Sequence, residues 1–203
     1  MALVVLMSTY NAQLSAQFSL LYEHEDEFPQ GGGNSNVRAV SDDYHGSSFM
    51  AGVFATSLTL GNITPTNATN ATGYFGKFNN GAFYWAWAKK ITLVTTSGTL
   101  AYTSSSDIRD AASDAAGNLY LIGSYIGGIK FDNIALTSKK TNGSFAYYDM
   151  YVAKINANGT CAWAKSFGTK NGSDWGQAIA VDGSGNVYVL STKRQLVLFG
   201  SSS

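Results

Sequence analysis

Short apolar stretches, hydrophobic on both alternating faces, run through the chain. In residues 118–122, NLYLI, Leu119 and Leu121 would lie on one face of a strand and Tyr120 and Ile122 on the other. A strand with one face in water would instead alternate apolar and polar residues. No segment carries a sustained helical stripe. The pattern predicts an almost entirely β chain whose strands are covered on both faces.

This stretch belongs to a unit that occurs three times. Asp43, Asp114 and Asp182 open the segments DYHGSSFMAGVF, DAAGNLYLIGSY and DGSGNVYVLSTK, which align without a gap. The units lie about seventy residues apart, a spacing that calls for a repeat architecture. The aligned positions include Gly46, Gly117 and Gly185, and also Phe49, Tyr120 and Tyr188. We expect these residues to occupy matching environments.

A second phrase is shared by the first two units. Residues 74–90, YFGKFNNGAFYWAWAKK, parallel residues 151–167, YVAKINANGTCAWAKSF. The matched pairs are Lys77 with Lys154, Gly81 with Gly159, and Trp87 with Trp163. The Asn-Gly pairs predict hairpin turns. The Asp-x-x-Gly-Asn segments predict tight turns in which Asp accepts backbone N–H groups and Gly adopts positive φ.

Each unit is therefore expected to contain about four strands. One ends at the anchor aspartate, one carries the opening phrase, one carries Tyr-x-x-Lys, and one carries Trp-Ala-Lys. A short extra strand is expected between the second and third, at 57–61, 128–132 and 196–200. Four antiparallel strands, apolar on both faces and repeated in tandem, predict an all-β fold of β-propeller blades, about two and a half of which are present.

The expected organisation follows from these repeats. Residues 36–106 form blade 1, residues 107–173 blade 2, and residues 174–203 an incomplete blade 3. Residues 18–35 are interpreted as an outer closing strand and linker. Residues 1–17 have the apolar run and small residues of a truncated signal peptide, although no Lys or Arg precedes Arg38. A β-strand or a disordered leader is the alternative for that segment.

The repeated motifs resemble a known family. The pattern Ala-x-Asp-x-x-Gly-Asn-x-Tyr, followed by Tyr-x-Ala-Lys-x-Asn-x-Asn-Gly and Trp-Ala-Lys, is similar to the bacterial β-propeller repeat called SBBP. The likeness is best in residues 110–190 and looser in the first unit, where Ser47 and Ser48 replace Asn-Leu. The resemblance implies a propeller fold and an extracellular or cell-surface setting. It implies no catalytic residue.

The number of repeats leaves two interpretations open. A propeller ring needs roughly four to eight blades, more than this chain provides. Either the chain is a piece of a longer protein, or several copies associate head to tail to complete a ring. We expect a fragment, because an isolated incomplete blade would leave apolar surface and an unpaired strand edge in water.

Composition and charge exclude some partners. With 13 basic and 13 acidic residues, the formal net charge is zero, so no electrostatic footprint for nucleic acid exists. No apolar run is long enough to span a bilayer. The single cysteine, Cys161, cannot form an internal disulfide and is expected to be a buried thiol.

Candidate chemistry is sparse. Neither His24 nor His45 has a nucleophile–base pattern around it, so no catalytic residue, metal site or cofactor is predicted. The acids of residues 23–27 are better explained as a solvated edge than as metal ligands. Residues 182–186, DGSGN, are similar to the opening of a calcium loop, but the counterpart DAAGN favours a turn.

Other positions are candidates for surface contacts. Asn-x-Ser/Thr occurs at Asn62, Asn67, Asn70, Asn142, Asn158 and Asn171, and most are expected to be unmodified. Residues 62–73 are interpreted as an exposed loop.

Trp175 follows a loop next to a strand start, a place suited to ligand contact. Arg38 and Arg109 match between units, and salt bridges are expected for them. Packing between blades is expected for Trp85, Trp87 and Trp163.

These observations favour a non-catalytic module of a secreted or cell-surface bacterial protein, acting as a scaffold or recognising a glycan or protein. One alternative is part of a propeller hydrolase or lyase whose catalytic residues lie outside this chain. Another is a self-assembling structural protein that associates through exposed blade faces. The ligand itself is not indicated by the sequence.

Overall fold

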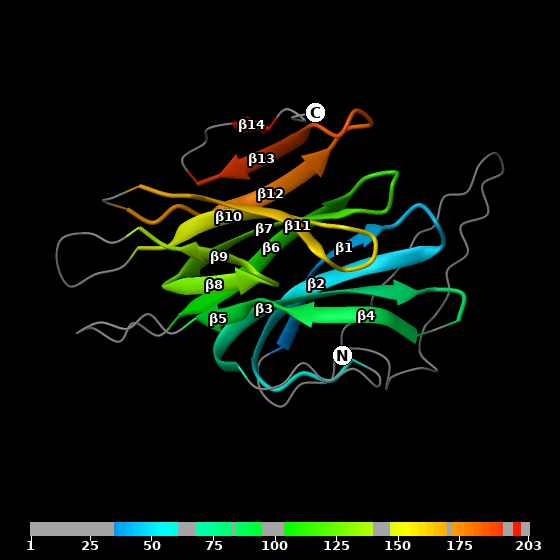
Figure 1. Ribbon diagram of the computed structural model, residues 1–203, viewed down its shortest axis with the longest axis horizontal. Helices are drawn as coiled ribbons and strands as arrows, with labels where there is room; N and C mark the ends of the chain where they lie inside the picture. The colour runs from blue at the N-terminus through cyan, green and yellow to red at the C-terminus, as the bar shows by residue number, and fades with distance from the viewer. Residues whose placement is uncertain are drawn as a thin grey trace.

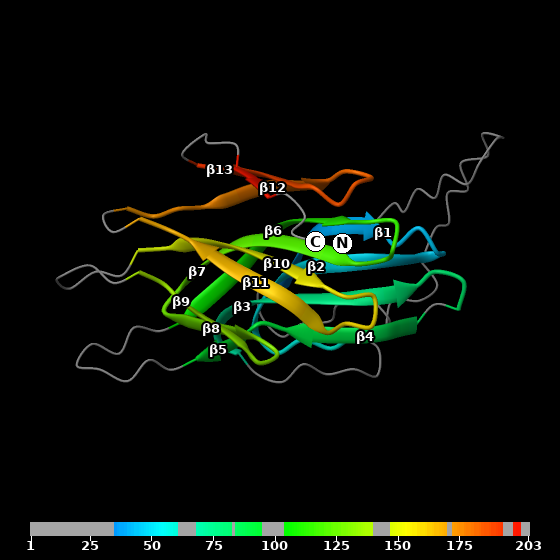
Figure 2. The ribbon, with the colours of Figure 1, turned by 45° about the horizontal axis from the view of Figure 1, so that its top comes forward.

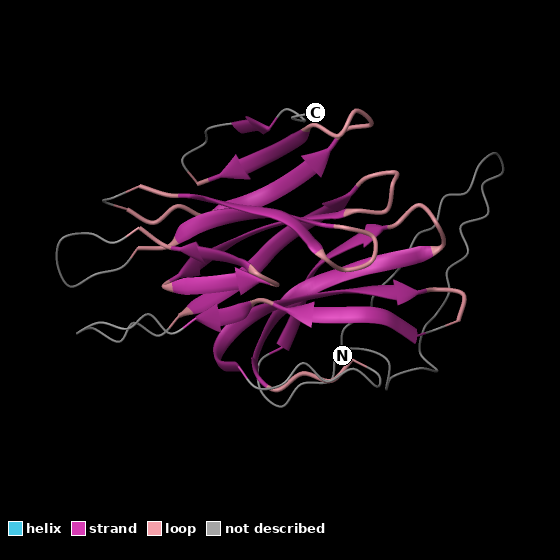
Figure 3. Ribbon diagram, viewed as in Figure 1, coloured by secondary structure: helices cyan, strands magenta, loops and turns pink. Residues whose placement is uncertain are grey.

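The computed structural model is all-β, and its sheets are open rather than closed into a ring (Figures 1 and 3). It describes residues 35–60, 68–82, 84–94, 104–139, 147–169, 172–192 and 197–199. The predicted leader, nearly all of the closing strand, and His24 with its acidic neighbours lie outside this part. Within it, no helix has the length and apolar character needed to cross a membrane.

Two sheets have the four antiparallel strands expected of a blade. Blade 1 consists, in spatial order, of β1 (Ser35–Asp42), β2 (Ser47–Thr56), β3 (Ala68–Asn79) and β4 (Tyr84–Lys90). Blade 2 consists of β6 (Ser105–Ser113), β7 (Leu119–Ile126), β10 (Asp149–Ile155) and β11 (Cys161–Phe167). Each strand pairs with its spatial neighbours in antiparallel register. The prediction of blades of four antiparallel strands is confirmed.

The third unit forms a smaller sheet. It contains β12 (Gly176–Val181), β13 (Val187–Ser191) and β14 (Val197–Phe199), with β13 in the middle. We refer to this sheet as blade 3. Its place in the stack follows that of blade 2, as Figure 2 shows.

The predicted extra strands of the second and third units are present as β8 (Gly128–Phe131) and β14 (Val197–Phe199), but they pair differently. In the second unit, β8 leaves blade 2 and forms a separate sheet with β5 (Thr92–Val94) and β9 (Ile134–Thr137). In the third unit, β14 pairs directly with β13. The edge of β7 that corresponds to this edge of β13 is already occupied by β10. The backbone N–H and C=O groups at that edge of β13 pair with β14, whereas β8 finds the same edge of β7 paired with β10 and joins another sheet.

Strand β7 is covered on both faces, as its pattern predicts. Leu119 and Leu121 belong to the apolar cluster between blades 1 and 2. Tyr120 and Ile122 belong to the cluster between blades 2 and 3. The blades therefore stack face to face, and each supplies the apolar cover of its neighbour.

The two outer faces of the stack differ. On blade 1, Tyr74 and Trp85 are buried in a cluster with Leu58 and Leu60, which lie just beyond β2. On blade 3, Leu190 is 48% exposed. The segment after β2 thus covers the first face, whereas the last face presents apolar surface to solvent.

The first strands of the blades carry the same irregularity. β6 is in contact with both β1 and β12, so the first strands lie where the blades converge. The pairing register shifts around Arg38 in β1, around Arg109 in β6 and around Gln177 in β12. Each residue is thereby left out of the ladder in a β-bulge, and the three positions are equivalent in the repeat. The match between the two arginines reflects this shared bulge.

One loop assignment is wrong. Residues 68–73 belong to strand β3 rather than to an exposed loop. Thr72 and Gly73 are buried, and the Thr72 hydroxyl donates to the Ile91 carbonyl at 2.7 Å. Asn-Ala-Thr repeats have the polar composition of a loop, but the buried partners of this strand override that preference. Asn62 and Asn67 lie outside the described residues.

Candidate functional site

The antiparallel order divides each blade into two rims. The turn rim holds the turns between first and second strands and the hairpins between third and fourth strands. It consists of residues 43–46, 79–82, 114–117, 156–159 and 182–185. The loop rim, at the other end of the strands, holds the longer connections. Around blades 2 and 3 it consists of residues 127–139, 147–148, 168–169 and 172–175.

Anchor aspartates organise the turn rim in blades 2 and 3. Asp182 Oδ1 accepts the backbone N–H groups of Ser184 and Asn186 at 2.9 and 2.8 Å. Its Oδ2 accepts the Asn186 side-chain amide at 2.8 Å and the Tyr188 hydroxyl at 2.9 Å. Asp114 makes the same four contacts with the equivalent residues of blade 2. Gly185 has a φ of 81°, as the turn requires.

These contacts confirm that the DGSGN segment is a turn. The Asn186 side chain and backbone N–H lower the pKa of Asp182 to about 2. The carboxylate is already surrounded by donors, which a cation would have to displace. Among the described residues, no group of three or more His, Cys, Asp or Glu side chains is placed to hold a metal ion.

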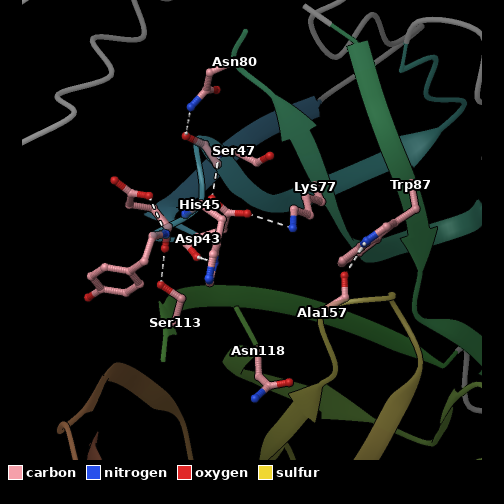
Figure 4. Close-up of polar contacts among 12 residues, drawn as sticks. Asp43, His45, Ser47, Lys77, Asn80, Trp87, Ser113, Asn118 and Ala157 are labelled. Carbon is pink, nitrogen blue, oxygen red and sulfur yellow. Dashed lines mark hydrogen bonds and ion pairs between the residues drawn. The ribbon is translucent and has the colours of Figure 1, made fainter. Parts of the chain in front are cut away.

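Blade 1 completes its anchor with a lysine instead (Figure 4). Asp43 Oδ1 accepts the backbone N–H groups of His45 and Ser47, as in the other blades. Phe49 stands in place of the tyrosine, and Lys77 Nζ lies 2.7 Å from Asp43 Oδ2. Burial alone would raise the pKa of Asp43, but the hydrogen bonds from Lys77, His45 and Ser47 hold it below its ordinary value.

A tryptophan connects the turn rims of blades 1 and 2, next to a histidine that bonds within blade 1. The His45 ring donates through Nδ1 to the Asp43 carbonyl oxygen at 2.7 Å. Trp87 Nε1 donates to the Ala157 carbonyl oxygen at 3.1 Å, across the junction (Figure 4). A side chain at Gly159 would meet the Trp87 ring at 2.9 Å. Gly159 therefore also leaves room for the Trp87 side chain of the neighbouring blade.

Trp85 and Trp163, for which packing was also predicted, lie against apolar clusters. Trp85 is buried in the cluster on the outer face of blade 1. Trp163 packs against the cluster between blades 2 and 3, with its ring centroid 6.2 Å from that of Tyr120. Packing is confirmed for Trp85, Trp87 and Trp163, although Trp85 does not lie between two blades.

Two buried aspartates shape the loop rim at the junction of blades 2 and 3. Asp149 Oδ2 accepts the Lys139 backbone N–H at 2.9 Å. Asp174 Oδ2 accepts the backbone N–H and the hydroxyl of Thr169 at 2.6 and 3.0 Å. Burial raises the pKa of Asp149 above its ordinary value. Asp149 directly follows Tyr148 in the chain, and Asp174 directly precedes Trp175.

These two aromatic side chains form a stacked pair. Their ring centroids lie 4.4 Å apart at an interplanar angle of 25°. The Asp174 backbone N–H donates to the Tyr148 carbonyl oxygen at 2.7 Å, and the Trp175 carbonyl oxygen accepts the Thr192 N–H at 3.0 Å. Both rings are partly exposed, and neither belongs to an apolar cluster of the described residues. They are held in place without being part of the core.

Arg109 completes this group from the first strand of blade 2. Its guanidinium carbon lies 5.9 Å from the Trp175 ring centroid. Its Nε lies 2.8 Å from Asp107 Oδ2, which confirms the salt bridge expected for this arginine. We call Asp107, Arg109, Tyr148 and Trp175 the junction cluster. Sequence reasoning singled out Arg109 and Trp175 but missed Asp107 and Tyr148, which lie far from Trp175 in the chain.

Other predicted positions are distributed elsewhere. Arg38 is exposed on its bulge in β1. Cys161 is partly rather than fully buried, and burial raises the pKa of its thiol to about 11. Asn158 is exposed, and its side-chain oxygen accepts the Thr160 hydroxyl at 2.7 Å. Asn70 donates to the Ser104 carbonyl oxygen at 3.2 Å. Asn142 and Asn171 lie outside the described residues.

Comparison with known proteins identifies the repeat. Residues 162–192 match the family model of the SBBP beta-propeller repeat. This segment runs from β11 to the end of β13 and includes the anchor Asp182 and Trp175. The resemblance carried by the repeated motifs is confirmed over this segment. None of the curated proteins compared with the chain matches it.

Proposed function

We propose that this chain, which carries a beta-propeller repeat, is a non-catalytic recognition module of a secreted or cell-surface bacterial protein. The stacked blades act as a rigid frame, and the loop rim contacts a glycan or protein ligand. The extracellular assignment is supported by the apolar N-terminal run and by the SBBP match.

The observation that carries this proposal is an unrepeated cluster on a repeated frame. Anchor aspartates, turn glycines and bulges recur in all three blades because each blade needs them to fold. The junction cluster does not recur: the position of Trp175 is Asp107 in the second unit and Asn36 in the first. Partly exposed aromatic rings that the frame does not require are suited to ligand contact.

A binding experiment tests the proposal. The purified chain would be applied to a glycan microarray and to immobilised collagen and fibronectin as protein probes. We expect saturable binding to at least one probe, lost in the double variant Tyr148→Ala, Trp175→Ala. Tyr84→Ala removes an aromatic side chain that is 48% exposed on blade 1 and serves as the matched control. Binding that persists in the double variant would contradict the assignment to the loop rim.

The exposed face of blade 3 favours a second candidate, self-association. Leu190 is 48% exposed on this face, whereas Ile122, at the equivalent position in blade 2, is fully buried by blade 3. A second copy could cover this apolar surface. Light scattering of the purified chain would show a concentration-dependent oligomer, and Leu190→Glu would return it to a monomer. A monomer at all concentrations would reject this candidate.

A further inference from the structure

We propose that the junction cluster is a binding subsite for a neutral pyranose sugar. This inference rests on the proposed function and names the ligand class for the same site. The cluster combines a stacked aromatic pair with an arginine–aspartate pair, drawn from blade 2 and from the loop that enters blade 3.

The aromatic pair supplies an apolar platform. The C–H groups on one face of a pyranose carry partial positive charge, which is attracted to the negative face of an aromatic ring. Tyr148 and Trp175 each retain partial exposure at the loop rim. Their stacking and backbone hydrogen bonds fix both rings before any ligand arrives. Such preorganisation reduces the entropy that binding would cost.

The Arg109–Asp107 pair supplies polar groups of both kinds. The ion pair engages Nε of the guanidinium, and no described residue pairs with its two terminal amino groups. The arginine side chain is 36% exposed and the aspartate 25%. The amino groups can donate hydrogen bonds. Of the carboxylate oxygens, Oδ1 accepts the Ser124 backbone N–H at 2.9 Å and Oδ2 engages Arg109, and each retains a lone pair that can accept a further hydrogen bond. Sugar hydroxyls do both, so they can be matched by this pair.

Local charge distinguishes a neutral sugar from an acidic one. Asp107 neutralises Arg109 at 2.8 Å. Asp110, one residue beyond the bulge, holds the Ile179 backbone N–H at 2.9 Å and adds a second carboxylate to the same strand. Asp149 and Asp174 lie directly beside the two aromatic residues in sequence and are buried. Arg109 and Lys139, whose charge acts on Asp149, supply two positive charges against these four carboxylates. A ligand carboxylate would therefore approach more negative than positive charge, which disfavours an acidic sugar.

The test uses the full chain and defined tetrasaccharides. Cellotetraose, maltotetraose, mannotetraose and xylotetraose would be titrated by calorimetry, with tetragalacturonate as the acidic comparison. We expect at least one neutral tetrasaccharide to bind and tetragalacturonate to bind more weakly. Trp175→Ala should weaken binding at least about tenfold, Arg109→Gln by roughly threefold to tenfold, and Tyr84→Ala should leave it unchanged.

A second readout does not depend on the folding of a variant. In the unaltered chain, the saturating sugar should shift the Trp175 indole N–H resonance in an NMR spectrum and leave that of Trp85, which is buried in blade 1, in place. The reverse pattern, or preference for tetragalacturonate, would overturn the inference.

Failure of this inference can be told apart from failure of the proposed function. Binding of a neutral sugar that neither shifts Trp175 nor weakens in Trp175→Ala leaves a recognition module but removes this subsite. Binding of a protein probe alone, lost in the double variant, retains the loop-rim function and rejects the sugar. Absence of binding to every glycan and protein probe contradicts both.

Discussion

Blades 1 and 2 use different side chains to pair the carboxylate of the aspartate at the anchor turn. In blade 2, Asp114 Oδ2 is held by the Asn118 amide at 2.9 Å and the Tyr120 hydroxyl at 3.0 Å, and Lys154 stays 3.7 Å away. In blade 1, serine and phenylalanine occupy the two partner positions, and Lys77 approaches Asp43 Oδ2 to 2.7 Å. The lysine is present in both blades, but only blade 1 depends on it.

The difference shows that the turn needs a fully partnered carboxylate rather than a particular partner. Asp43 has no exposed side-chain surface, so an oxygen without a partner could not turn to water. Two neutral donors satisfy this need in blade 2, and one cation satisfies it in blade 1. A repeat can therefore lose part of its consensus motif and retain its geometry.

Removing the lysine should produce the largest contrast between the blades. Lys77→Met leaves Asp43 Oδ2 buried without its charge partner and should lower the free energy of unfolding by about 3 kcal/mol. Lys154→Met leaves the two neutral donors on Asp114 and should cost about 0.5 kcal/mol. Urea unfolding of both variants measures the two values. Equal losses would contradict the comparison.

A compensating change sharpens this prediction. Phe49→Tyr introduces the hydroxyl that Tyr120 provides in blade 2. In the Lys77→Met background it should recover about 1 kcal/mol of stability by donating to Asp43. In the unaltered chain the same substitution should gain much less, because the lysine already occupies that oxygen. No coupling between the two substitutions would show that the sites are not equivalent.

Removing a neutral donor should have an intermediate effect. Tyr120→Phe deletes the hydroxyl on Asp114 and makes blade 2 similar to blade 1, so Lys154 becomes the remaining charge partner. We expect a loss of about 1 kcal/mol. In this background Lys154→Met should cost more than it does alone. Denaturant unfolding of the single and double variants measures this coupling, and strictly additive losses would oppose the account.

Changes in pH should have the smallest effect on stability, and the effects of the turn-rim Asp182 and the loop-rim Asp149 should have opposite signs. Hydrogen bonds lower the pKa of Asp182 to about 2, so the stability it contributes is present above its unfolded pKa of 3.8 and is lost as pH falls from there toward 2. Burial raises the pKa of Asp149, so its contribution is present below 3.8 and is lost as pH rises through the folded pKa. Asp149→Asn should remove the second dependence and leave the first, as measured by thermal unfolding across pH. An unchanged profile would contradict the assignment.

The blade frame could be predicted from sequence because its causes are local and repeated. The alternation around Tyr120 indicates two covered faces, and the Asp-x-x-Gly-Asn segments carry their own hydrogen-bond partners. The pairing of β14 with β13 could not be predicted, since it depends on which strand edge is free. The stacking of Tyr148 on Trp175 could not be predicted either, because it joins unrepeated residues from two blades. Residues 68–73 were misassigned because their polar composition conceals buried partners.

The central claim is that consecutive repeats are separate blades stacked face to face, and an engineered disulfide tests it most directly. The hydroxyl oxygens of Ser41 in blade 1 and Ser113 in blade 2 lie 2.6 Å apart. In a Cys161→Ala background, Ser41→Cys with Ser113→Cys should form an intramolecular disulfide under mild oxidation, detected by mass spectrometry of the linked peptides. Two thiols that stay free in the folded, oxidised monomer would contradict the stacked arrangement.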